Sequence, residues 1–95
     1  MLHRLFLVAA LLAAAMPEAR AAASASATAY GKARTLLHRM ESDPKRLRYR
    51  HHWLGVIAAF NEVASDYPTS PEAPDAVFTA AKLWARLHTV SHRTS

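Results

Sequence analysis

Apolar residues recur at three- and four-residue intervals along three segments of the chain, at residues 27–41, 44–66 and 71–91. This spacing places them on one face of an α-helix, and no segment shows the sustained alternation typical of a strand. The pattern therefore predicts an all-α fold. The positions expected on these faces are Tyr30, Ala33, Leu37 and Met40; Leu47, Arg50, Trp53, Leu54, Val56, Ile57, Phe60, Val63, Ala64 and Tyr67; and Val77, Ala80, Leu83, Trp84, Leu87 and Val90.

Capping residues and prolines mark the predicted helix ends. Asp43-Pro44 suits a helix start, because Asp accepts a bond from a free N–H and Pro needs none at the first position. Pro68 ends the second helix, and Ser70-Pro71 is expected to cap and begin the third, although Pro74 allows the start to slip to Ala73. The short connections predict three antiparallel helices.

The N-terminal segment has the pattern of a cleavable secretory signal peptide. A weakly basic start at His3 and Arg4 precedes the apolar run 5–15, and small residues follow Pro17. Ala19-Arg20-Ala21 fits a cleavage site, with residues 21–23 as an alternative. The apolar run is too short for a bilayer, which needs about 20 residues. We therefore expect residues 1–21 to be removed and the rest to reach the periplasm without a stable membrane span.

Composition limits what the expected mature segment, 22–95, can do. Removing 21 of the 95 residues leaves 74, enough for one small domain. The chain has no Cys, which excludes disulfides, thiolate metal sites and a lipid-modified cysteine. Its net charge of +5 falls by one, to +4, when Arg4, Glu18 and Arg20 are removed. If the chain is exported, we expect the anionic partner of this positive charge to be an envelope polymer, a lipid headgroup or an acidic protein, and not nucleic acid.

The junction between the second and third predicted helices indicates which class of helical protein this is. The junction comprising Ala59-Phe60, Val63-Ala64, Asp66-Tyr67-Pro68, Ser70-Pro71, Ala73, Ala76, Ala80-Ala81 and Leu83-Trp84 resembles the helix-turn-helix of tetratricopeptide-like repeats in bacterial envelope proteins. With Tyr30, Ala33, Leu37, residues 43–46 and residues 49–53, it resembles the N-terminal region of some bacterial N-acetylmuramoyl-L-alanine amidases. The resemblance implies that further repeats and a zinc-hydrolase domain belong after this region. The third helix keeps its apolar stripe almost to residue 95, so we expect an incomplete repeat array.

No catalytic or cofactor-binding constellation is expected within this chain. His88 and His92 are four residues apart, but no acidic residue accompanies them, and catalytic zinc normally takes three protein ligands. Adjacent His51 and His52 would point about 100° apart on a helix. We therefore predict no catalytic residues, no metal site and no cofactor.

One basic cluster is the candidate binding site. It lies at the predicted start of the second helix, while Glu62 and Asp66 lie at its end, so both ends oppose the helix dipole. Antiparallel packing would add Arg39, Arg86, His88 and Arg93 to the basic end and Glu72 and Asp75 to the acidic end. A charged surface with no ligand remains the alternative. The site residues are Lys45, Arg46, Arg48, Tyr49, Arg50, His51 and His52.

These features predict an exported, non-catalytic helical module for protein or cell-wall interaction, as the N-terminal part of a peptidoglycan amidase. Its partner would be another protein, the repeats or catalytic domain expected after it, or an anionic cell-envelope polymer. The alternative is a free-standing small periplasmic helical protein that binds an anionic ligand or a metal.

Overall fold

The computed structural model describes the backbone of residues 2–91 and the side chains of residues 18–91. Within this part of the chain there are four helices and no strand, which confirms the all-α fold. The helices are α1 (Leu2–Glu41), α2 (Pro44–Leu47), α3 (Arg50–Asp66) and α4 (Glu72–Thr89).

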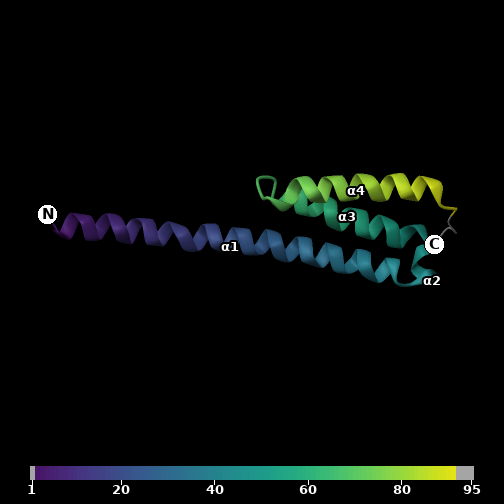
Figure 1. The fold of residues 1–95 in the computed structure, drawn as a ribbon, viewed down its shortest axis with the longest axis horizontal. Helices are drawn as coiled ribbons and strands as arrows, with labels where there is room; N and C mark the ends of the chain where they lie inside the picture. The colour runs from purple at the N-terminus through teal and green to yellow at the C-terminus, as the bar shows by residue number, and fades with distance from the viewer. Residues whose placement is uncertain (1, 92–95) are drawn as a thin grey trace.

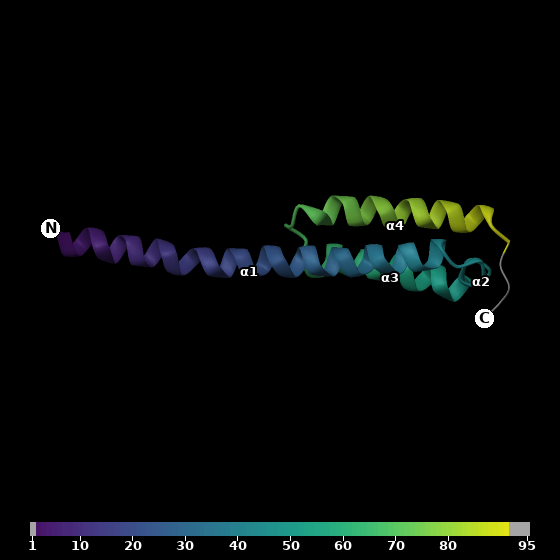
Figure 2. The same ribbon diagram turned by 60° about the horizontal axis from the view of Figure 1, so that its bottom comes forward.

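The three long helices lie side by side in an elongated molecule of about 72 × 19 × 16 Å (Figure 1). α3 runs opposite to α1 and α4, and α2 is a short link at the end where α1 turns into α3 (Figures 1 and 2). Two bonds fix the register of α1 against α4. Ser26 contacts Glu72 at one end, and Arg86 donates to Glu41 at the other.

The core lies where α1 and α4 both face α3. Phe60 is fully buried at its centre, and the Tyr30 ring meets it edge-on with centroids 5.8 Å apart. Edge-to-face pairs of this kind add to the free energy gained from burial alone. The other buried apolar residues are Ala33, Met40, Trp53, Val56, Ile57, Val63, Ala73, Ala76, Ala80, Leu83 and Leu87.

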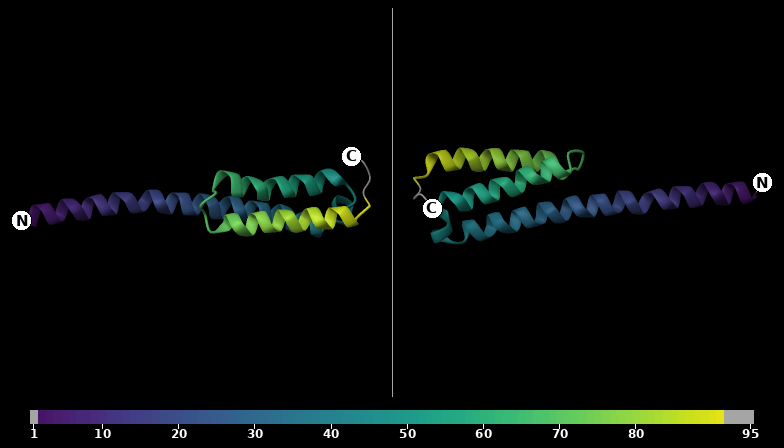
Figure 3. Two further views of the ribbon diagram at one scale, coloured as in Figure 1. Left: turned by 90° about the horizontal axis from the view of Figure 1, so that it is seen from above. Right: turned by 180° about the vertical axis from the view of Figure 1, so that it is seen from behind.

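The first helix begins far earlier than the predicted residue 27, because α1 starts at Leu2. Residues 19–29 are almost all Ala, Ser and Thr, and alanine has the highest helix propensity, so this segment favours continuing the helix towards the N-terminus. The N-terminal half of α1 projects beyond the other helices (Figure 3). The predicted boundary at residue 21 therefore falls inside a continuous helix.

The predicted single helix over 44–66 is wrong, because the chain leaves helical geometry between α2 and α3. Tyr49 is extended, with φ −113° and ψ 125°. The last bonds of α2 run from the N–H groups of Arg48 and Tyr49 to carbonyls three residues back. The carbonyl of Leu47 instead accepts a 3.1 Å bond from Trp53 Nε1. The break thus exchanges a backbone hydrogen bond for a buried indole bond, and it also separates Arg46 from Arg50, which one helix would have paired as like charges.

The start of α4 also differs in detail from the expectation. Asp43 caps α2 as predicted, but Ser70 does not cap α4, because its hydroxyl donates to the Tyr67 carbonyl at 2.7 Å. Pro71 occupies the N-cap position of α4 without a side-chain bond. The turn between α3 and α4 is therefore closed by Ser70 from the α3 side.

The inward face of α4 is rotated from the one predicted. Ala80, Leu83 and Leu87 are buried as expected, whereas Val77, Trp84 and Val90 are exposed. Their places are taken by Ala73 and Ala76. A small side chain leaves room for a neighbouring backbone to approach closely, so Ala73 and Ala76 pack inward with Leu83 and Leu87, while Val77, Trp84 and Val90 remain outside.

Phe60→Ala should destabilise the fold by about 3–5 kcal/mol, the usual cost of removing a buried aromatic ring. Domains of this kind have a total stability of about 5–15 kcal/mol, so a large part of it should be lost. Urea unfolding followed by circular dichroism measures the change. Leu36→Ala, at a side chain 40% exposed, is the control and should cost less than about 1 kcal/mol. Equal effects of the two changes would contradict the core described here.

Candidate anion-binding site

The predicted basic cluster lies at the junction of α2 and α3, next to the C-terminal end of α1. Lys45 and Arg46 belong to α2, Arg48 and Tyr49 form the break, and Arg50 opens α3. The cluster is thus carried by two helices and the bend between them. This bend decides which side chains share a surface.

Asp43 organises the α2 end of the cluster. Its Oδ1 atom accepts a 2.9 Å bond from the Lys45 N–H, and its Oδ2 atom lies 3.3 Å from Arg46 Nε. The ion pair is about 43% exposed on each side, so it contributes little to stability. Its main effect is to orient Arg46, whose terminal guanidinium nitrogens make no other hydrogen bond to the described part of the chain.

Three members of the cluster share one small hollow of about 170 Å³ between the end of α1 and the start of α3. Arg46, His51 and His52 supply its polar groups. Leu36 and Met40 reach it from α1 and give it an apolar side. A cationic rim beside an apolar wall suits a carboxylate that carries a short apolar group. The remaining lining residues are Gly55 and Val56.

The electrostatics of the hollow favour an anion. Desolvation lowers the pKa of His52 below its ordinary value of 6.5, and the neighbouring His51 and Arg46 lower it further. Asp43 acts in the opposite direction but does not outweigh them. The ring centroids of His51 and His52 are only 4.0 Å apart. His51 and Arg46, the two groups that repel a proton on His52, would also attract a negative ligand.

Tyr49 lies beside this hollow rather than inside it. Its ring is half-buried, and its centroid lies 6.1 Å from that of His51 at an interplanar angle of 38°. Trp53, four residues further on, is buried in the core as predicted. Tyr49 therefore extends the hollow with an aromatic surface on which a sugar ring could stack.

The structure does not bring the other cluster members into the hollow. Lys45 and Arg48 are exposed and do not line it. Arg50 lies against α4 instead, with its guanidinium carbon 5.9 Å from the centroid of the Trp84 ring. The break at Tyr49 thus divides one sequence cluster between two surfaces.

Arg86 reaches the same end of the molecule from α4, as expected, but it is not free for a ligand. Its Nη1 atom donates to Glu41 at 3.2 Å, and its guanidinium carbon lies 5.1 Å from the Trp53 ring centroid. The sequence prediction missed Glu41 as a partner at this end. Arg39 and His88 are exposed on α1 and α4, and Arg93 lies outside the described residues.

The described part of the chain contains no group of three or more His, Cys, Asp or Glu side chains arranged to hold a metal ion. Of the pair His88 and His92, His92 lies outside the described residues. No helix within the described residues has an apolar stretch long enough to cross a bilayer.

The lowered pKa of His52 predicts that folding weakens as the solution becomes more acidic. The unfolded chain takes up the proton near pH 6.5 while the folded chain resists it, so stability falls below that pH and levels off below the folded pKa. His52→Gln should reduce the loss of stability between about pH 7 and about pH 5. Urea midpoints at the two pH values measure it. His38→Gln, on the exposed side of α1, should leave the loss unchanged; a His52→Gln variant with the original pH dependence would contradict the assignment.

Comparison with known protein families, with curated proteins and with solved structures finds no match to this chain. The resemblances to tetratricopeptide-like repeats and to the amidase N-terminal region therefore remain predictions.

Proposed function

We propose that this chain is an exported, non-catalytic helical module of tetratricopeptide-like type that binds anionic groups of the cell wall. The observation that carries the proposal is the hollow in which Arg46, His51 and His52 converge beside an apolar wall. Peptidoglycan offers carboxylates on short peptides, next to sugar rings. The expected mode is surface docking, not chemistry on the ligand.

The donor set suits a carboxylate. A guanidinium group donates several hydrogen bonds in a planar fork that matches the two oxygens of a carboxylate. The neighbouring imidazoles add ring N–H donors. Tyr49 provides an adjacent aromatic surface. The hollow is open and shallow, so affinity would depend strongly on salt.

Export is supported by the separation of the predicted signal peptide from the bundle. The N-terminal half of α1 projects past the other helices, whereas Ser26, near the middle of α1, is buried and contacts Glu72 (Figure 1). Ser26 Oγ also lies 2.9 Å from the Ala23 carbonyl oxygen. Cleavage after Ala21 would remove the projecting segment and keep both contacts.

Export therefore predicts a mature chain that begins at Ala22. Mass spectrometry of the protein recovered from the periplasm of the producing cell measures its N-terminus. Ala21→Leu should block or shift processing, since a large side chain does not fit the small-residue cleavage pattern. Ala27→Leu, an exposed position on α1 outside both candidate cleavage sites, is the control. A protein that stays in the cytoplasm with Met1 intact would contradict export.

The proposed place of this module is the N-terminal part of a peptidoglycan amidase. In that arrangement the module would hold the wall while a separate zinc-hydrolase domain cleaves it. The reading frame after residue 95 distinguishes this from the alternative, a free-standing helical protein that binds an anionic ligand or a metal. A continuation with further repeats and a hydrolase domain supports the amidase, and an unrelated gene supports the alternative.

Binding to the wall should weaken when the basic rim is neutralised. Arg46→Gln with Arg48→Gln removes one hydrogen-bonded cation from the hollow and one beside it, and retention on purified peptidoglycan should fall about tenfold, as loss of a charge-assisted bond implies. Co-sedimentation at low and at physiological salt measures the change.

The matched control is Lys32→Gln with Arg34→Gln, which removes the same charge from exposed positions on α1. If the control weakens retention as much as the Arg46 and Arg48 double variant, attraction is due to net charge and the hollow is not a site. If neither variant changes retention, the wall is not the ligand.

A further inference from the structure

The strongest unexplained feature is an apolar surface on α4. Five large apolar side chains are exposed in the described part of the chain; three of them belong to this helix, and a fourth, Val90, is its C-cap. Phe78 is 62% exposed and Val77 is 52% exposed. Monomeric proteins rarely leave several such side chains together in water. The four are Val77, Phe78, Trp84 and Val90.

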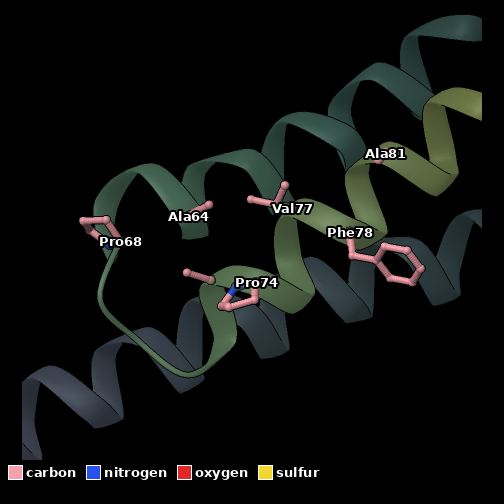
Figure 4. Close-up of a pocket in the computed structure, with 7 residues that line it drawn as sticks. Ala64, Pro68, Pro74, Val77, Phe78 and Ala81 are labelled. Atoms are coloured by element: carbon pink, nitrogen blue, oxygen red, sulfur yellow. The ribbon is translucent and has the colours of Figure 1, made fainter.

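Part of this surface is a groove between α3 and the start of α4 (Figure 4). It has a volume of about 500 Å³, and no charged side chain lines it. Pro68 and Ala64 form the α3 side, and Phe78 stands at the opposite rim (Figure 4). The other lining residues are Ala73, Pro74, Val77 and Ala81.

The apolar surface continues from this groove towards the C-terminal end of α4. Phe78, Ala81 and Trp84 are spaced three residues apart, so they follow one another along neighbouring turns of the helix. α1 is bound to another side of α4, through Glu72 and Arg86. Lys82 Nζ lies 4.7 Å from the Phe78 ring centroid and Arg50 lies over the Trp84 ring, but no other helix of the described structure packs over the strip from the groove to Trp84.

We propose that a second copy of this chain covers the strip, with the two α4 helices antiparallel about a twofold axis at Ala81. Such an axis places each residue opposite the one equally far from Ala81 in the other direction. Phe78 of one copy then faces Trp84 of the second copy, and the reverse pair forms on the other side of the axis. The interface is self-complementary, as twofold symmetry requires.

Side-chain size supports this register. Ala81 at the axis and exposed Ala85 one turn later leave room for two helix axes to approach to about 8 Å. Phe78 and Trp84 can then flank the crossing and fill the second copy's groove. Aromatic residues placed this way provide most of the binding free energy in protein interfaces.

The charges select a second copy over an arbitrary apolar partner. Asp66 and Asp75 are exposed at the end where α3 turns into α4, and neither forms an ion pair within the described residues. Arg50 and His88 lie at the other end, both beside Trp84. An antiparallel arrangement brings the acidic end of each copy to the basic end of the other, whereas a parallel one would set like charges together.

The absence of cysteine makes a direct test possible. Ala81→Cys places the only thiol of the protein at the proposed axis, where it meets its own symmetry mate. Ala58→Cys is the matched control, because Ala58 is exposed on α3 and does not line the groove. Cells producing each full-length variant are treated with a copper–phenanthroline oxidant, and the protein is examined on a non-reducing gel.

We expect the disulfide-linked dimer of Ala81→Cys to exceed that of Ala58→Cys at least tenfold. Equal cross-linking of the two variants would overturn the inference. A second comparison uses no cysteine: Ala81→Arg should shift the protein recovered from cells from dimer to monomer in sedimentation equilibrium, and Ala58→Arg should not. A parent protein that remains monomeric at about 100 μM would also overturn it, since interfaces of about 1,200 Å² or more normally associate below that concentration.

This inference does not depend on the proposed function. Ala81 lies on α4, away from the hollow. The Ala81→Arg variant should therefore be retained on peptidoglycan as well as the parent protein is, at saturating ligand. Loss of the dimer with wall binding intact, or the reverse, therefore assigns each failure to its own surface.

Discussion

The indole of Trp53 joins all four helices at one end of the molecule. It is buried on α3, and its Nε1 atom donates to the Leu47 carbonyl at the end of α2. Arg86 of α4 lies over its ring and also binds Glu41 of α1. An unsatisfied buried carbonyl costs about 1–3 kcal/mol, and the Leu47 carbonyl is partly buried, so the indole bond stabilises the break between α2 and α3.

The break converts a stretch of like charges into two separate surfaces. On one continuous helix, Arg46 and Arg50 would lie one turn apart and repel each other. In the structure Arg46 turns to Asp43 and the hollow, while Arg50 turns to Trp84. The first surface is the candidate anion site and the second is the edge of the apolar strip. One local change of backbone direction therefore supplies both proposed contacts of the module.

The sequence was sufficient for the helical class, for the Asp43 cap and for most of the core, because these depend on local periodicity and on a side chain close in sequence. The break at Tyr49 was not predictable, since it depends on an indole six residues from the carbonyl that it satisfies. The rotation of α4 was missed for a related reason. Periodicity marked Val77 and Trp84 as inward, but only the packing of α3 shows that the narrow alanine face fits there.

The sequence predicted the types of residue at the site, but only three of the seven predicted residues line the hollow. Adjacent positions suggested that His51 and His52 would diverge, yet their ring centroids lie 4.0 Å apart. Leu36 and Met40 line the hollow from α1, which no pattern near residue 50 could indicate. Arg86 is likewise paired with Glu41 and so does not contribute a free cation to the expected basic surface. Contacts between distant segments decided each of these outcomes.

The charge distribution links the two proposed surfaces. α3 carries bases in its first turn and acids near its end, the opposite of what the helix dipole favours, and each misplaced exposed charge costs about 0.3–1 kcal/mol. An anion in the hollow would offset this cost at the basic end. A second copy would offset it at both ends, since its acidic end lies against the first copy's basic end. Both interactions are electrostatic in part, so salt should weaken wall binding steeply and the dimer less, because the apolar contacts of Phe78 and Trp84 are not screened.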